Sequence, residues 1–127
     1  MSVTRLVSAL EQIPFADGEI RSISLDLDGL VIRFCDWRDR WFEFVFPDHH
    51  WMSERYAINA PLDRVTIVSN NPVLTEVIES LVNEGLPEST WGSLNKVNFI
   101  SADSDPNPVL SIIADELRVR GLEYDVG

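Results

Sequence analysis

The sequence predicts an α+β fold: an antiparallel β-meander sheet of about five or six strands, packed with two or three helices. Residues 19–46 contain three strand-like runs separated by two turn signals, as in a meander. Residues 3–13 and 72–82 instead place apolar side chains three and four positions apart, as in amphipathic helices. A length of 127 residues without a linker-like stretch predicts one domain over residues 1–127.

The first turn signal of the meander is Asp28-Gly29, a pair typical of two-residue hairpin turns. This turn would place Leu27 opposite Leu30 and keep the apolar residues of both strands on one face. A second turn at residues 38–40 would add the third strand in the same way. The two pairings together predict a single apolar face, formed by Ile23, Leu25, Leu27, Leu30, Ile32, Phe34, Phe42, Phe44 and Phe46.

The flanking elements are predicted from their apolar spacing and their ends. Residues 3–13 predict a helix, and residues 62–69 predict a fourth strand. Asn71-Pro72 predicts a helix start, because asparagine is a good N-cap and proline fits the first helical turn. Gly85 predicts the end of that helix, because glycine tolerates the left-handed conformation that closes many helices.

Three later segments have less regular patterns. Residues 48–59 show no clean period and predict an irregular connection, whereas residues 96–101 predict a short strand. Residues 108–120 fit a second helix, because their start and end repeat the caps of the first helix. Their first half equally fits a strand that pairs with residues 97–101, and we favour the strand there.

Composition excludes some partners and favours others. The chain carries 21 acidic and 10 basic residues, a formal net charge of −11, so we expect neither nucleic acid nor an anionic membrane as a partner. A basic protein partner remains compatible with this charge. One cysteine, Cys35, permits no disulfide within the chain and fits a reducing cytoplasm. Neither a signal peptide nor a membrane-spanning stretch is visible in the sequence.

Residues 25–29 (LDLDG) and 65–71 (VTIVSNN) resemble the first two motifs of the haloacid-dehalogenase-like phosphatases. The resemblance implies Asp26 as nucleophile, Asp28 as general acid and base, and Ser69 as the residue that holds the phosphoryl group. The alternation of polar and apolar residues around Asp26 instead indicates a half-exposed hairpin strand, not the family's buried parallel strand. We therefore expect no catalytic residue, and we keep a degenerate phosphatase as an alternative.

Two clusters have some features of metal sites. His49 and His50 are adjacent, but neighbouring residues of a strand point to opposite faces. Asp103, Asp105 and Asn107 alternate as in a calcium loop, yet the glycine and the final glutamate of that motif are missing. We expect no metal and no cofactor.

The run from Asp36 to Asp48, with two tryptophans and three phenylalanines, and the segment 94–114 look like small bacterial α+β proteins, some of which resemble immunity proteins of polymorphic-toxin systems. The resemblance implies a cytoplasmic, non-enzymatic module that binds and blocks a toxin domain. Its acidic charge would suit a basic toxin. The partner-binding residues that we predict are Trp37, Arg38, Asp39, Trp41, Asp48 and Trp51.

The exposure of these tryptophans is open at this point. Exposed aromatic residues beside arginine are typical of binding hot spots. Alternatively, Trp37 and Trp41 form a cross-strand pair beneath a helix. A structural or oligomerising domain without a ligand is a third hypothesis, and the sequence gives neither the partner's identity nor the oligomeric state.

Overall fold

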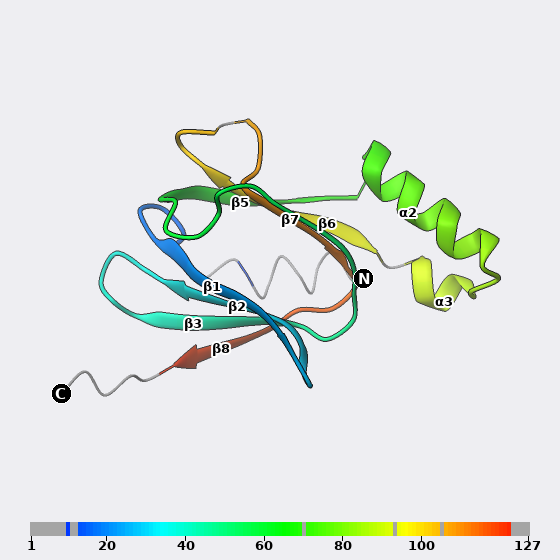
Figure 1. Cartoon of the computed structure of the whole chain (residues 1–127), viewed down its shortest axis with the longest axis horizontal. Helices are drawn as coiled ribbons and strands as arrows, with labels where there is room; N and C mark the ends of the chain where they lie inside the picture. Colours follow the sequence, from blue (N-terminus) through cyan, green and yellow to red (C-terminus); the bar gives the residue numbers. More distant parts are fainter. Residues whose placement is uncertain (1–9, 11–12, 70, 93, 105, 123–127) are drawn as a thin grey trace.

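The structure, a computed structural model, describes residues 10, 13–69, 71–92, 94–104 and 106–122. Within these ranges, eight strands form two antiparallel sheets of four strands each. Figure 1 shows the sheets as two layers, with the helices beyond one end of the upper layer. The fold is therefore mostly β. The predicted α+β arrangement, one meander sheet packed with two or three helices, is wrong.

The first sheet, sheet A, contains the predicted meander. Its strand order is β1-β2-β3-β8, so the first three strands pair consecutively and the last of the described strands lies beside β3. The bounds of its strands are β1 Glu19–Asp26, β2 Gly29–Cys35, β3 Trp41–Phe46 and β8 Arg118–Leu122.

Both hairpins of sheet A are shifted by two residues from the predicted register. Leu30 pairs with Leu25 instead of Leu27, and Ile32 pairs with Phe44 instead of Phe46. A shift of two leaves every side chain on its predicted face, because side chains alternate with a period of two. The apolar face is therefore largely confirmed, with fully buried side chains at Leu30, Ile32, Phe34, Phe44 and Phe46.

The shift is accompanied by the exposure of two leucines that we predicted on the buried face. The β1–β2 turn consists of Leu27 and Asp28, and Gly29 already pairs with Asp26. Leu27 is fully exposed and Leu25 is 70% exposed, so their predicted burial is wrong. Gly29 has a φ of 118°, and a Cβ there would lie 2.4 Å from the Phe46 carbonyl oxygen, so only glycine fits.

The second sheet, sheet B, has the strand order β4-β7-β6-β5. Residues 48–59, predicted as an irregular connection, contain strand β4, so that prediction is wrong. Residues 108–120 contain β7 and most of β8, so the strand favoured for their first half is confirmed and the helix alternative is wrong. The bounds are β4 His49–Glu54, β5 Leu62–Val68, β6 Asn95–Ser101 and β7 Leu110–Ala114.

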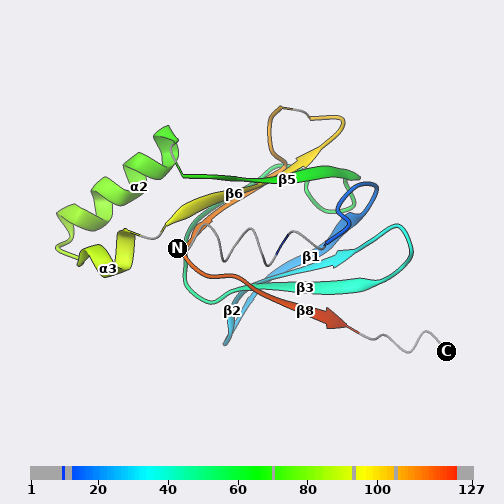
Figure 2. The ribbon, with the colours of Figure 1, turned by 180° about the vertical axis from the view of Figure 1, so that it is seen from behind.

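Two helices, α2 (Pro72–Asn83) and the single-turn α3 (Glu88–Trp91), follow β5. Both predicted ends of α2 are confirmed: the Asn71 side chain accepts a hydrogen bond from the Val73 amide at 2.9 Å, and Gly85 adopts a φ of 81° just after the helix. Figure 2 shows both helices beyond the end of sheet B. No helix in the described ranges is long and apolar enough to cross a membrane.

The main core lies between the two sheets. Phe34 and Phe44 of sheet A stack with ring centroids 5.8 Å apart, and Phe44 reaches Phe99 of sheet B at 6.2 Å. The predicted helix over residues 3–13 lies largely outside the described residues, although Leu10 is buried in this core. A smaller apolar cluster joins the helices to the outer face of sheet B, through Leu74, Leu81, Leu94 and Ile113.

Candidate functional site

Four of the six predicted contact residues lie together at the β2–β3 turn. Trp37, Arg38 and Asp39 form the turn itself, and Trp41 begins β3. Trp37 is 59% exposed, and the Arg38 guanidinium lies over its ring, 4.5 Å from the centroid. An exposed tryptophan and arginine in contact match the predicted hot-spot chemistry.

The buried carboxylate of Asp36 holds this turn in shape. Its Oδ1 accepts hydrogen bonds from the amides of Arg38 (2.9 Å) and Arg40 (2.8 Å), and its Oδ2 accepts one from Arg40 Nε at 2.7 Å. Burial alone would raise the pKa of Asp36. The hydrogen bonds from Arg40 and Arg38 and the Arg40 charge outweigh burial, so this pKa lies below its usual value.

Cys35, not Trp37, is the cross-strand partner of Trp41. The predicted alternative, a Trp37–Trp41 pair beneath a helix, is therefore wrong. Cys35 is buried. Burial raises the pKa of its thiol, and the nearby Asp39 and Asp36 carboxylates add to the increase. The thiol is accordingly a small buried group with little nucleophilic character.

Asp48 lies at the opposite end of β3, in the β3–β4 turn, beside a feature that we name the acidic tip: Leu25, Asp26, Leu27 and Asp28. The backbone of Gly29, directly after the tip, packs against that of Pro47, directly before Asp48. Figure 1 shows the acidic tip and the β2–β3 turn at opposite ends of sheet A. The predicted contact residues of sheet A therefore fall into two separate groups.

The acidic tip exposes apolar surface that the sequence interpretation missed. The Asp28 amide donates a hydrogen bond to Asp26 Oδ1 at 2.8 Å, which closes the turn and turns the Leu27 side chain out to solvent. The sequence Asp26-Leu27-Asp28 is itself a signal for a turn at Leu27, because an aspartate side chain favours turns by accepting a hydrogen bond from the amide two residues on. A turn centred on Leu27-Asp28 instead of Asp28-Gly29 would have predicted an exposed Leu27.

The same turn bears on the phosphatase motifs. Asp26 ends an antiparallel edge strand of sheet A, whereas Ser69 follows β5 in sheet B. Figure 1 shows the ends of these two strands far apart. The described residues therefore do not bring Asp26, Asp28 and Ser69 into one pocket, as the shared phosphoryl group of that family would require.

Trp51, the sixth predicted residue, lies in β4 on the outer face of sheet B, where it lines a polar cleft of about 890 Å³. We name this feature the sheet B cleft. Strands β4, β6 and β7 form its floor, and the loops after β4 and β6 form its rim. Its lining includes Trp51, Ser53, Arg55, Tyr56, Lys96 and Ser111.

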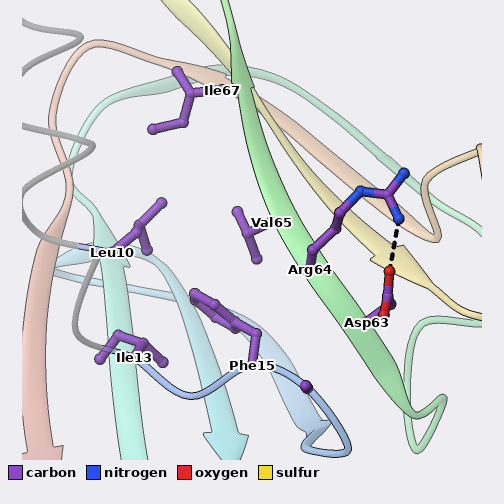
Figure 3. A pocket seen from close by; sticks show the side chains of 8 residues that line it. Leu10, Ile13, Phe15, Asp63, Arg64, Val65 and Ile67 are labelled. Carbon is purple, nitrogen blue, oxygen red and sulfur yellow. Dashed lines mark hydrogen bonds and ion pairs between the residues drawn. The ribbon is translucent and has the colours of Figure 1, made fainter.

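A second cavity, of about 430 Å³, opens between β5 and the segment that precedes β1. Figure 3 shows Leu10, Ile13 and Phe15 on one side of it and Val65 and Ile67 on the other, while the Arg64 and Asp63 side chains form an ion pair with each other away from the apolar residues. The apolar part of its wall is an extension of the main core.

Within the described residues, no three His, Cys, Asp or Glu side chains gather as metal ligands would. His49 and His50 occupy the start of β4, and His50 Nε2 lies 3.9 Å from Asp48 Oδ2. Comparison with known proteins finds no matching family model, no matching curated protein and no matching solved structure.

Proposed function

We propose that the chain is a non-catalytic protein-binding module that docks a basic protein surface through the acidic tip. The observation that carries the proposal is the fully exposed side chain of Leu27, with Leu25 70% exposed beside it. Burying one such leucine at an interface contributes about 1.5–3 kcal/mol. A partner that covers the tip gains this contribution from both leucines.

The charge around the tip selects a basic partner. Asp26 and Asp28 flank Leu27, and Asp48 lies in the adjoining turn, with its side chain 76% exposed. None of the tip residues is basic, and the whole chain carries a net charge of −11. A negative rim around exposed apolar side chains steers a positive surface toward them and penalises a negative one.

The partner class in this proposal is a basic toxin domain, which the module binds and blocks as an immunity protein does. The resemblance of residues 36–48 and 94–114 to such proteins supports this class. We place the module in the cytoplasm, where the single thiol of Cys35 stays reduced. Trp37 and its neighbours, at the other end of sheet A, form the second candidate contact.

The test is co-expression with the protein encoded next to this chain, followed by affinity measurement on the purified pair. We expect the wild type to relieve the neighbour's toxicity. The double variant Leu25→Ser/Leu27→Ser should bind at least about a hundredfold more weakly, because two exposed leucines contribute about 3 kcal/mol or more. Val82→Ser on α2, a 47% exposed apolar residue outside the tip, is the matched control.

The outcomes separate the hypotheses. A neighbour that the wild type neither binds nor blocks would remove the immunity proposal. If Trp37→Ala weakens binding and the double leucine variant does not, the contact lies at the β2–β3 turn. If the wild type self-associates and the leucine substitutions abolish this, the oligomerising alternative is supported.

A further inference from the structure

Nearly all basic side chains on the described residues are matched to a partner. Of the nine, Arg38 stacks on Trp37, whereas Lys96 and Arg55 have no carboxylate partner among the described residues and both line the sheet B cleft. The other six form ion pairs with Asp or Glu: Arg21, Arg33, Arg40, Arg64, Arg118 and Arg120. The two cations without a described carboxylate partner or an exposed tryptophan partner, Lys96 and Arg55, thus line the same cleft.

Lys96 is the stronger indication of a ligand site, because most of this residue is buried. It is the only lysine in the chain, and the residue is 9% exposed. Its ammonium lies 5.8 Å from the centroid of the Trp51 ring, which also lines the cleft. A cation–π contact offsets part of the cost of removing a charge from water, but an anion offsets far more. In a chain with 21 acidic residues, no described carboxylate supplies that anion.

The floor of the cleft is polar beside Lys96. Ser111 donates a hydrogen bond to Asn98 Oδ1 at 2.7 Å, and Ser53 pairs with Ser111 on the neighbouring strand. Ser53 and Ser111 both line the cleft. The Ser111 proton is already donated to Asn98, so the Ser53 hydroxyl is the one suited to donate a hydrogen bond to an anionic group that enters.

The volume of the cleft and the residues on its rim indicate the size, shape and charge of the ligand. About 890 Å³ lies in the range of sites for small organic molecules, about 300–1,000 Å³, and exceeds what a simple ion requires. Trp51 and the 88% exposed Tyr56 offer flat apolar surfaces. Glu54 and Asp103 also line the cleft, and their charges disfavour a second negative charge on the ligand.

We propose that the sheet B cleft binds a small organic monocarboxylate, with its carboxylate at Lys96 and its flat body against Trp51. The site lies on the outer face of sheet B and is independent of the acidic tip.

The test uses phenylacetate as the probe and phenylacetamide as its uncharged counterpart, with ionic strength matched by chloride. The full-length chain is titrated and the four tryptophan indole N–H signals are followed by NMR, with the Trp51 signal assigned from Trp51→Phe. We expect phenylacetate to shift the Trp51 signal and leave the Trp37 signal in place. Phenylacetamide should bind at least about tenfold more weakly, because it loses the charge-assisted contact.

Two variants of Lys96 isolate the cation. Lys96→Met should weaken phenylacetate binding at least about tenfold, while Lys96→Arg, which keeps the charge, should retain most of it. The midpoint of thermal unfolding without ligand should stay at or above the wild-type value in Lys96→Met, because methionine fills the same enclosed position without a charge that lacks a carboxylate partner. This second readout also shows that the variant folds. Arg38→Met removes a cation from an exposed tryptophan outside the cleft and is the control, with wild-type binding expected.

Three results would overturn the proposal. One is the absence of a Lys96-dependent shift of the Trp51 signal with phenylacetate. Another is equal binding of phenylacetamide. The third is tighter binding of phenyl phosphate, which would assign the cleft to a dianion. The proposal for the acidic tip fails or stands separately, because the two sites lie on different sheets. We accordingly expect Leu25→Ser/Leu27→Ser to bind phenylacetate as the wild type does.

Discussion

A single carboxylate organises the β2–β3 turn, and the sequence gives no sign of it. Asp36 looks like one of four charged residues within five positions, Asp36, Arg38, Asp39 and Arg40, yet it alone turns inward. Its side chain is fully buried and accepts three hydrogen bonds from Arg38 and Arg40. Trp37 is presented to solvent because this carboxylate fixes the backbone on both sides of it.

Replacement of Asp36 should therefore destabilise the fold in a pH-dependent way. Asp36→Asn keeps an acceptor for the amides but loses the charge-assisted bond from Arg40, so we expect a loss of about 1–2 kcal/mol in the free energy of unfolding at pH 7. The pKa of Asp36 is lowered in the folded state, so its stabilisation is complete above the unfolded-state pKa of about 4. It is lost as pH falls through the lower folded-state pKa.

Urea unfolding across this pH range measures the effect. The difference between wild type and Asp36→Asn should shrink as the solution becomes more acidic than about pH 4, because the wild-type carboxylate then becomes neutral. Asp39→Asn makes the same chemical change in the same turn, at an exposed residue with a φ of 62° that asparagine tolerates well. A pH-independent difference for Asp36, or an equal loss for Asp39→Asn, would contradict the assignment.

At the scale of elements, the sequence predicted those whose signals are local. Helix α2 has an asparagine cap and a closing glycine, and both act as expected. The strands of the meander alternate, so their faces were predictable, while a register shift of two residues leaves no trace in that alternation. Strand β4 (HHWMSE) and strand β8 (RVRGL) lack a clean alternation, and they become strands by pairing with β7 and β3, distant in sequence.

The end of α2 supports a prediction with an unusually close control. A Cβ added at Gly85 or at Gly121 would meet no atom within 4 Å, but only Gly85 has a positive φ, at 81°. Gly85→Ala should therefore lower the free energy of unfolding by about 1 kcal/mol through backbone strain alone. Gly121→Ala should be neutral or slightly stabilising. Urea unfolding of both variants checks this, and equal effects would contradict the conformational explanation.

At the scale of the whole molecule, the division into two sheets was beyond the sequence. The chain crosses between the layers at the β3–β4 turn, through Pro47 and Asp48, and returns between β7 and β8. Nothing in those short connections distinguishes a change of sheet from a hairpin. The predicted contact residues were consequently scattered, since Trp41 and Trp51 were assigned to one contact surface and lie in different sheets.

The net charge of −11 leads to a prediction for the molecule as a whole. Salt screens the repulsion among the acidic residues, which stabilises the fold, but it also weakens the ion pairs, which destabilises it. The six arginine–carboxylate pairs are mostly exposed on the arginine side, and exposed pairs contribute little, at about 0–1 kcal/mol each. We therefore expect repulsion to dominate and the midpoint of thermal unfolding to rise as sodium chloride increases.

Helix α2 and its cap provide the variant that tests this balance. Glu76, Glu79 and Glu84 are exposed and form no ion pair in the described structure, and their replacement by glutamine changes the net charge from −11 to −8. The triple variant should be more stable than wild type at low salt and should gain less from added salt, because less repulsion remains to be screened. Association with a basic partner should slow over the same salt range in which the wild type becomes more stable, since screening that removes self-repulsion also removes steering. A midpoint that falls with salt, or an equal slope for both proteins, would show that the ion pairs outweigh the net charge.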